Sequence, residues 1–412
     1  MTWLFIFHRD LRIIDNNTLE TLHGNIIPAF IFTPEQVDKN KYKSTNAIQF
    51  MLESLEDLDT ELRRRNSKLH CFHDTIENVL NSLPSTITGI ADGIDYTPYA
   101  YERTQRIRNW CRTHGKEYRQ EHDIYIHPPG TILNKSGKPY QKFTPFYETS
   151  LQIPVKPPRK NTSLTFTKSP LHGQVSLAEM WKHLVPVVNS NLHVHGGRTR
   201  ALQLLSELPD VLRTYEDAKD YPTMRTSWLS AHNHFGTISI REVYSAAKSY
   251  PAFIRQLYWR DFYGHVIAAF ENLYGVSPYD FTGKRKWREG AAADADFRAW
   301  CNGRTGVDIV DAGMQQLNKT GYIPNRVRLI VGSYLVNELG ISWKKGEEYF
   351  SRHLVDVDYA QNMGNWSWLD GSTPYGQNPL RIMSVTRQEQ KFDPRGEYSS
   401  DWLGVRAGGN DN

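Results

Sequence analysis

Short apolar segments of strand length alternate with a helical pattern over the first 130 residues. The apolar segments are Thr2–Phe7, Asn25–Phe32, Lys68–Phe72 and Thr88–Ala91. Between the second and the third, residues 46–65 carry apolar side chains at helical spacing, behind Ser44 or Thr45 as the capping residue. Strands that alternate with helices indicate a parallel, doubly wound sheet with helices on both faces. We therefore expect a Rossmann-like α/β domain over residues 1–130.

The pattern changes twice further along the chain. Prolines crowd the stretch from His127 to Ser190, and because proline fixes φ and lacks a backbone donor, we expect a linker over 131–195 that wraps over the surface. From Gly196 onward the spacing is helical, which predicts a compact all-α domain over 196–412. The predicted helices are Arg198–Leu208, Ile240–Ser249, Phe253–Phe270, Ile309–Thr320, Asn325–Leu339 and Lys345–Leu354.

Composition excludes several protein classes. No apolar run approaches the ~20 residues of a membrane-spanning helix. The three cysteines form no CxxC pair, which is typical of a reduced compartment, here the cytoplasm or nucleus. The formal net charge of +4 permits a nucleic-acid partner. The 12% of aromatic residues, 11 Trp among them, suits either a large core or the stacking of planar ligands.

The common nucleotide and metal motifs are missing from the sequence. Where a GxGxxG turn would follow the first strand, residues His8–Arg12 stand instead, so this sheet lacks the usual phosphate-binding turn. The sequence holds no Walker A loop and no HExxH. His193 and His195 form a possible metal pair, but without a further ligand nearby we favour a loop.

Four segments of the helical half carry functional side chains. The hydroxyl residues of Thr226–Ser230 precede a helix, which they either cap, the favoured interpretation, or open to a phosphate. Gln256 and Trp259 share one helix face by i, i+3 spacing, in a helix that is either core or the wall of a cavity. The other two segments are Asn325–Leu329 and Asp356–Trp368. Because buried carboxylates need partners, an Arg328–Asp356 ion pair is predicted.

These segments together resemble the cryptochrome/photolyase family, and most closely its class I-like CPD photolyases. The resemblance covers nearly the whole chain and rests on Phe5–Arg12, Trp259–Tyr263, Gly303–Met314, Asn325–Arg326, Asp356–Trp368 and Lys391–Trp402. It implies an N-terminal α/β domain of the kind that carries an antenna chromophore, and an all-α domain that binds FAD bent into a U. It also accounts for the missing GxGxxG turn.

The resemblance further implies which residues bind FAD. The diphosphate would lie against Thr226, Ser227, Leu229, Ser230 and Arg260. Asp356 and Asp358 would bind the adenine-ribose and isoalloxazine side, with Arg328 paired to Asp356 and Asn362 facing flavin N5. Plant cryptochromes have Asp and insect-type cryptochromes have Cys at that last position. A neutral amide favours the reduced flavin, because it binds N5 without adding a buried negative charge.

Three tryptophans match the electron-transfer chain of the family. The resemblance puts Trp366 near the flavin, Trp343 midway and Trp300 at the surface. The substrate that it implies is a UV-induced pyrimidine dimer in DNA, which is flipped out easily because it stacks and pairs poorly. Blue light would excite the reduced flavin, whose electron then splits the cyclobutane ring.

The residues expected at the lesion include departures from the family. Trp259 and Trp368 would form the apolar wall, and Asn325 and Arg326 would support the lesion and its backbone. Gln256 stands where CPD photolyases usually have Glu, and Gln is typical of (6-4) photolyases. The His pair of (6-4) enzymes is absent, however, and Leu329 replaces the usual Met. Tyr215 is a doubtful flavin contact, because its segment is one residue shorter than usual.

Two alternative functions therefore stay open: a (6-4) or single-strand-selective photolyase, and a cryptochrome-type photoreceptor. We expect the photoreceptor less, because the chain ends at Asn412, soon after Trp402, with no signalling tail. An antenna chromophore, folate or deazaflavin, is common in the family, and Glu102 aligns with a folate contact. The expected partner is UV-damaged DNA, with no membrane and a monomeric chain. Arg387 and Lys391 are candidate phosphate contacts.

Overall fold

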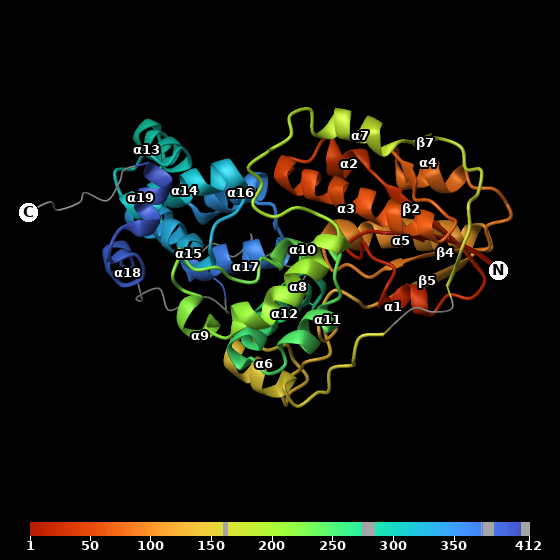
Figure 1. Cartoon of the computed structure of the whole chain (residues 1–412), viewed down its shortest axis with the longest axis horizontal. Coiled ribbons are helices and arrows are strands. Elements are labelled where there is room, and N and C mark those ends of the chain that lie inside the picture. The colour runs from red at the N-terminus through yellow and green to blue at the C-terminus, as the bar shows by residue number, and fades with distance from the viewer. Residues whose placement is uncertain (160–163, 274–284, 372, 374–382, 405–412) are drawn as a thin grey trace, which may run out of the picture.

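The protein is described by a computed structural model that covers residues 1–159, 164–273, 285–371, 373 and 383–404, with the side chains of 270–273 left undescribed. The chain forms two lobes that share a long contact (Figure 1). One lobe holds the sheet near the N-terminus, and the other consists of helices. Within the described ranges, no helix combines the length and apolar character that crossing a lipid bilayer requires.

The first lobe is built on one sheet with the order β5-β4-β1-β2-β3-β7, and β6 pairs with β2 off this path. Its strands are β1 (Thr2–Ile6), β2 (Asn25–Ile31), β3 (His70–Phe72), β4 (Gly89–Gly93), β5 (Glu117–Glu121), β6 (Thr165–Phe166) and β7 (Gln174–Val175). Every pairing is parallel except β3 with β7. The expected doubly wound α/β architecture is confirmed.

Helices cover both faces of this sheet, and each begins where the sequence offers a cap. The helices are α1 (Asn17–Glu20), α2 (Pro34–Val37), α3 (Thr45–Arg64), α4 (Ile76–Asn81) and α5 (Pro98–Thr113). The hydroxyl of Ser44 accepts a hydrogen bond from the backbone of Ala47 at the start of α3, as the sequence predicted. Buried side chains of α3 and β2 share one core cluster.

The segment 131–195 differs from the expected surface linker. It folds into α6 (Phe143–Ser150), β6, β7 and α7 (Leu177–Leu184), and so adds two short strands to the sheet. Its prolines break the regular elements into short ones, since each removes a backbone donor. The boundaries near 130 and 195 stay a prediction.

The second lobe is helical, as predicted. Its helices are α8 (Arg198–Leu212), α9 (Tyr215–Ala218), α10 (Ser230–Phe235), α11 (Ile240–Ala247), α12 (Pro251–Leu273), α13 (Ala291–Cys301), α14 (Asp308–Thr320), α15 (Asn325–Ser333), α16 (Trp343–His353), α17 (Tyr359–Asp370), α18 (Val385–Phe392) and α19 (Glu397–Leu403). They surround a single large apolar cluster. A π-helical turn, Tyr334–Glu338, interrupts the helix that we expected to continue to Leu339.

A buried group of charges joins the two lobes. Arg241 of α11 contacts Asp15 at 3.0 Å and Asp123 at 2.8 Å. Arg12 also pairs with Asp123, and all four side chains are less than a tenth exposed. Because each charge has an opposite partner, the group tolerates burial and fixes how the lobes meet.

Candidate functional site

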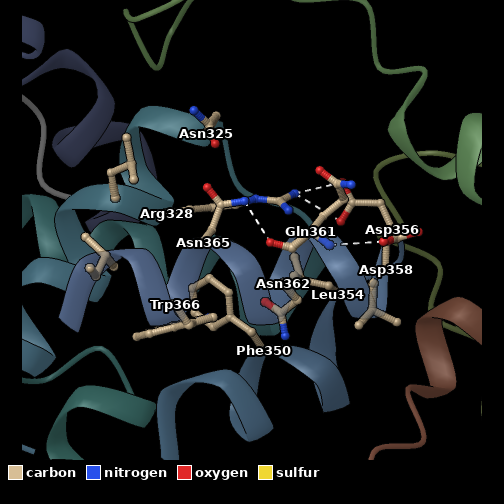
Figure 2. Close-up of a pocket in the computed structure, with 13 residues that line it drawn as sticks. Asn325, Arg328, Phe350, Leu354, Asp356, Asp358, Gln361, Asn362, Asn365 and Trp366 are labelled. Atoms are coloured by element: carbon tan, nitrogen blue, oxygen red, sulfur yellow. Dashed lines mark hydrogen bonds and ion pairs between the residues drawn. The ribbon is translucent and has the colours of Figure 1, made fainter. Parts of the chain in front are cut away.

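A pocket in the second lobe gathers six of the site residues that the sequence selected (Figure 2). Helices α15, α16 and α17 and the connection 354–358 between the last two supply its wall. The lining residues are Asn325, Arg328, Leu329, Phe350, Leu354, Asp356, Val357, Asp358, Gln361, Asn362, Asn365, Trp366 and Leu369. The open part of the pocket is about 60 Å³.

The predicted Arg328–Asp356 ion pair is present at the mouth of this pocket. One guanidinium nitrogen of Arg328 donates to both carboxylate oxygens of Asp356, at 2.8 and 3.0 Å. The Asp356 side chain is 3% exposed and that of Arg328 is 25% exposed. Charge-assisted hydrogen bonds of this kind hold a guanidinium firmly, so a cation borders the pocket in a fixed position.

Asp358 forms ion pairs with a residue of each lobe. Its carboxylate pairs with Arg9, which follows β1, and with Nδ1 of His234 on α10 at 3.1 Å. It also accepts from the backbone of Gln361 and so caps α17. Burial acts to raise the pKa of Asp358, but Arg9 and His234 outweigh it and hold that pKa well below its usual range. The carboxylate is therefore ionised and positions the start of α17.

Asn362 lies one turn into α17 and its amide orientation is fixed by α16. Its Nδ2 donates to Oε1 of Glu347 at 2.9 Å, to Oγ of Ser351 at 2.9 Å and to the Glu347 carbonyl at 3.1 Å. With its donors occupied, Asn362 has Oδ1 left for a ligand in the pocket. Glu347 and Ser351 were not selected from the sequence, since a Glu and a Ser on a helix carry no signal by themselves.

The three selected tryptophans are all buried, which corrects one prediction. Trp366 lines the pocket, but Trp300, expected at the surface, is 0% exposed. Its ring lies 6.3 Å from that of Trp366, and its Nε1 donates to the Val331 carbonyl. Trp343 is 2% exposed. Trp300 packs into the core because α13 turns that face inward, so the expected surface position was wrong.

A tryptophan that we did not select, Trp287, is more exposed than Trp300. Trp287 is half-buried against the same core, under the guanidinium of Arg285 at 5.0 Å. The next residue, Arg288, donates its backbone N–H to the Gly340 carbonyl. Trp287 thus borders the segment that leads into Trp343.

The segment Thr226–Ser230 does not cap its helix, so the favoured interpretation was wrong. Helix α10 begins with Leu229 at the cap position and has no side-chain cap. Instead, Thr226 hydrogen-bonds to the buried Tyr322, whose ring lies 5.7 Å from the Arg328 guanidinium. Thr226 and Ser227 are half-buried, Leu229 is buried and Ser230 is exposed. The segment therefore adjoins the Arg328 side of the pocket.

Arg260 lies behind α10. It donates to the carbonyls of Ile124 at 2.8 Å and Asn233 at 3.1 Å, with its guanidinium 4.9 Å from the ring of Tyr125. The Arg260 carbonyl accepts from Nε2 of Gln361. These contacts tie α10, α12 and α17 together. The expected contact between Arg260 and a phosphate stays a prediction.

The residues expected at the lesion form a looser group. Trp259 stacks on Phe143 at 3.7 Å between ring centroids, and both Trp259 and Trp368 are half-buried on the adjoining helices α12 and α17. Gln256 is half-buried and Asn325 is exposed.

Arg326 is already engaged. It binds Asp220 at 2.8 Å and Gln388 at 3.1 Å, and its guanidinium lies 4.4 Å from the ring of Phe392. These contacts brace α15 against α18, and the expected role of Arg326 at the DNA backbone stays a prediction.

The structure also places the other residues that the sequence analysis mentioned. His193 stacks on Tyr322 at 4.3 Å, whereas His195 binds Glu53, so the two do not form a metal pair. Tyr215 is buried against Phe253. Glu102 is exposed on α5.

A second, larger cavity of about 490 Å³ lies between the lobes. Aromatic and apolar side chains from the first lobe line it, together with the cations Arg9, Lys43 and Arg103. From the second lobe it is lined by His234, Phe235, Glu347, Ser351, Val357 and Tyr359. Val357 borders both cavities.

Comparisons with known protein families match both parts of the chain. The family described as DNA photolyase matches residues 3–162. The family described as the FAD binding domain of DNA photolyase matches residues 253–408.

Individual relatives match over most of their length. A deoxyribodipyrimidine photo-lyase of Halobacterium salinarum is 31% identical, over 97% of this chain and 88% of the relative. Cryptochrome-2 of Arabidopsis thaliana is 28% identical, over 96% of this chain and 69% of the relative. The crystal structure of an archaeal photolyase from Sulfolobus tokodaii with two FAD molecules has a TM-score of 0.86 and 34% identity, and the match covers 98% of this chain and 90% of that chain.

Proposed function

This chain belongs to the DNA photolyase family, and we propose that it splits cyclobutane pyrimidine dimers in UV-damaged DNA with the energy of blue light. The alternatives are a (6-4) or single-strand-selective photolyase and a photoreceptor without repair activity. The observation that carries the proposal is one pocket that combines a fixed guanidinium, an oriented amide and a tryptophan, in a chain 31% identical to a deoxyribodipyrimidine photo-lyase.

The side chains around the pocket fit FAD by their chemistry. A flavin ring offers N–H donors and carbonyl acceptors along one edge and apolar faces. The Arg328–Asp356 pair and the amides of Asn362 and Asn365 suit such an edge, whereas Phe350 suits a face. We propose that these residues hold the flavin, and that Thr226–Ser230 binds the diphosphate beside Tyr322.

When bound, reduced FAD supplies the light-driven electron that splits the dimer, and the protein supplies position and electrostatics. Asn362 offers Oδ1 to a ring N–H, because Glu347 and Ser351 hold its Nδ2. An amide in this position adds no charge. A reduced, anionic ring is therefore more stable beside this amide than it would be beside a carboxylate. Arg328 places a cation nearby, and Asp356 keeps that cation from being left unpaired.

We propose that electrons reach the pocket through Trp366 and Trp343, with Trp287 rather than Trp300 at the solvent end. The support is that Trp287 is half-buried and Trp300 fully buried. In holoenzyme carrying oxidised FAD, Trp366→Phe and Trp287→Phe should slow photoreduction, and Trp300→Phe should slow it less. Repair by enzyme that was reduced beforehand should survive in all three variants. Slow photoreduction in Trp300→Phe alone would contradict this route.

The proposed lesion wall consists of Trp259 and Trp368, with the amides of Gln256 and Asn325 at its polar edge. Holoenzyme with reduced FAD should restore thymine dimers in an irradiated oligonucleotide under blue light and not in the dark. Recovery of (6-4) products without recovery of thymine dimers would favour the alternative that Gln256 raises. Flavin photoreduction without any repair would favour the photoreceptor. Because phosphate contacts dominate such binding, affinity for damaged DNA should fall with rising salt.

We propose that the cavity between the lobes takes the antenna chromophore. Its volume of about 490 Å³ and its mixture of aromatic walls with Arg9, Lys43 and Arg103 suit a planar anion. A folate and a deazaflavin both have that character. Titration of the holoenzyme with each, followed by energy transfer to the flavin, distinguishes them. If neither chromophore binds, the claim that this cavity takes an antenna chromophore is wrong.

A further inference from the structure

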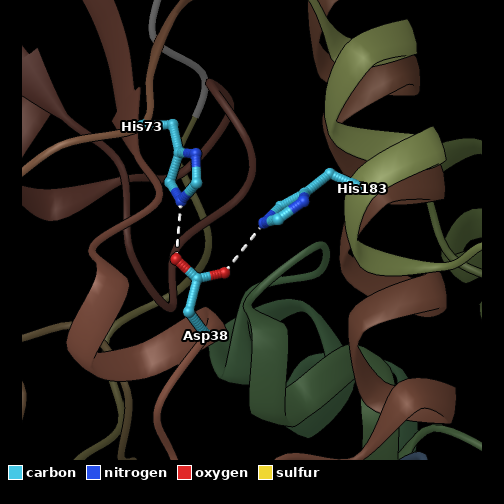
Figure 3. A group of neighbouring side chains, drawn as sticks. All are labelled: Asp38, His73 and His183. Carbon is cyan, nitrogen blue, oxygen red and sulfur yellow. Dashed lines mark hydrogen bonds and ion pairs between the residues drawn. The ribbon is translucent and has the colours of Figure 1, made fainter.

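Asp38, His73 and His183 meet at the surface of the first lobe (Figure 3), and none of the three lines either cavity. Asp38 directly follows α2, His73 directly follows β3, and His183 lies in the last turn of α7. The two imidazole rings approach the carboxylate from different sides, each with Nε2 toward one oxygen. Nothing in the proposed photochemistry uses these residues.

The three ligating atoms are already grouped as a metal ion requires. Nε2 of His73 lies 2.9 Å from Oδ2 of Asp38, and Nε2 of His183 lies 2.9 Å from Oδ1. All three ligating atoms lie within 4.8 Å of one another. Around a tetrahedral zinc ion with bonds of about 2.0–2.1 Å, neighbouring ligand atoms are about 3.3 Å apart. Side-chain rotations of partly exposed residues therefore suffice to close the set.

Separate anchors hold the segments that carry His73 and His183. Antiparallel pairing of β3 with β7 fixes the segment before His73 against the segment that leads into α7. A capping box of Ser176 and Glu179 starts α7, and Nε1 of Trp181 donates to Glu56 of α3 at 2.8 Å. His73 and His183 thus project from backbone that is fixed by other contacts, as pre-organised metal sites require.

We propose that Asp38, His73 and His183 bind a divalent ion of the zinc type. Two imidazoles and one carboxylate suit Zn²⁺ and its neighbours among the transition metals, whereas Mg²⁺ and Ca²⁺ prefer oxygen ligands. A neutral imidazole carries one N–H, and its transfer to Nδ1 leaves the Nε2 lone pair for the metal. The remaining coordination positions face solvent, since the side chains of Asp38 and His183 are 28% and 52% exposed.

The ion would fasten α7 to the loop between α2 and α3. That loop also borders the cavity between the lobes, which is lined by Gln36, Val37, Asn40 and Tyr42 on either side of Asp38 in sequence. Metal binding is therefore expected to stabilise one wall of that cavity and to raise the melting temperature of the chain, because the ion binds only the folded arrangement.

The test measures zinc bound by the full-length holoprotein after treatment with EDTA and dialysis against micromolar Zn²⁺. Wild-type protein should bind one ion per chain and melt at a higher temperature with Zn²⁺ than without it. The His73→Ala/His183→Ala variant should lose that ion and the shift in melting temperature. Asp38→Asn and His183→Gln should weaken binding by more than about tenfold, the loss that even an outer-sphere partner can cause.

His195→Ala is the matched control. His195 is 50% exposed, pairs with Glu53 at 3.0 Å, and is not part of the three-residue group. It should leave the stoichiometry unchanged, and millimolar Mg²⁺ should not displace the zinc. No bound zinc in the wild type would overturn the proposal, since the group would then be a hydrogen-bonded trio only. Equal zinc binding by the wild type and by the double variant would overturn it too. If the double variant fails to fold, the two conservative variants decide.

Discussion

Asp261 lies on α12 in the interior, 0% exposed, with His127 and Arg260 as its neighbours. Its Oδ2 accepts from the backbone of His127 at 3.1 Å, and its Oδ1 has no partner among the described residues. Burial, only partly offset by Arg260, raises the pKa of Asp261 to about 7. The folded protein thus binds this proton more tightly than the unfolded chain does.

A pH-dependent effect on stability follows from Asp261. The folded state loses stability as pH rises from the unfolded pKa near 4 to the folded pKa near 7, because the buried carboxyl must ionise. Relative to Asp261→Asn, the wild type should lose about 3 kcal/mol of unfolding free energy between pH 5 and pH 8. Urea denaturation of both proteins at several pH values measures this. A pH-independent difference between them would show that Asp261 titrates normally.

The amide of Asn362 offers a second test. Asn362→Asp would bring a carboxylate to the position where Nδ2 now donates to Glu347 at 2.9 Å. Two buried acceptors in contact should cost about 1–3 kcal/mol, through the lost hydrogen bond and the unsatisfied group. The loss should be greatest at high pH, where both carboxyls ionise. Urea denaturation of the apoprotein measures it, with Gln388→Glu on α18 as a half-exposed amide control. Equal stability of Asn362→Asp and wild type would contradict the claim that Glu347 and Ser351 fix the amide of Asn362.

At the scale of elements, a glycine on α16 allows α17 to approach that helix closely. A Cβ on Gly346 would lie 2.4 Å from the ring of Trp366 and 2.6 Å from the side chain of Leu335. Neither neighbour has room to move in this core, because both are buried. The glycine therefore sets the position of Trp366 against the pocket.

Gly346→Ala should consequently displace Trp366. The overpacking should lower the unfolding free energy by about 1–3 kcal/mol, even though Gly→Ala by itself favours a helix. Flavin photoreduction in the holoenzyme should slow as well. Lys345→Ala on the exposed side of the same helix should change neither quantity. A Gly346→Ala protein as stable and as quickly photoreduced as the wild type would mean that Trp366 is not held at this contact.

Most elements could be predicted from the spacing of their apolar residues, because burial of one face of a helix or strand determines that spacing. β1 to β4, the helix expected over residues 46–65 and the six helices expected in the second lobe are present. The edge strand β5 was missed because its sequence, EYRQE, is polar and only alternately half-buried. The π-helical turn at Tyr334 was missed because it changes the hydrogen bonding within a helix and not its apolar pattern.

The site was predictable where its residues lie close in sequence. Arg328–Asp356 and the α17 residues follow from buried charge and helical spacing. Arg9 and His234 were missed, although they hold Asp358, because their contacts join positions 349 and 124 residues away. No local pattern records such pairings. A signal existed for Arg9, since a charge three residues after a buried strand needs a partner.

At the scale of the whole molecule, the buried charges of Arg12, Asp15, Asp123 and Arg241 connect the lobes. We keep the domain boundaries near 130 and 195 as a proposal, with this group at the junction. Arg241→Met leaves Asp15 without its ion-pair partner in a position that is 1% exposed. The expected loss is about 3–5 kcal/mol, the cost of removing one partner from a buried ion pair.

Chemical denaturation of Arg241→Met measures that loss, and Arg63→Ala is the control. Arg63 pairs with Asp59 on the surface of α3 and is 65% exposed, so its removal should cost less than about 1 kcal/mol. Equal losses in the two variants would mean that the junction is solvated and contributes little.

The central claim is that the helical lobe binds a flavin at Arg328, Asp356 and Asn362. The absorption spectrum of the purified full-length protein, after incubation with FAD and gel filtration, tests it most directly. We predict about one FAD for each chain in the wild type and a large loss of FAD in Asp356→Ala, with the Glu53→Ala variant unchanged. A colourless wild-type protein that cannot be reconstituted with FAD would contradict the account.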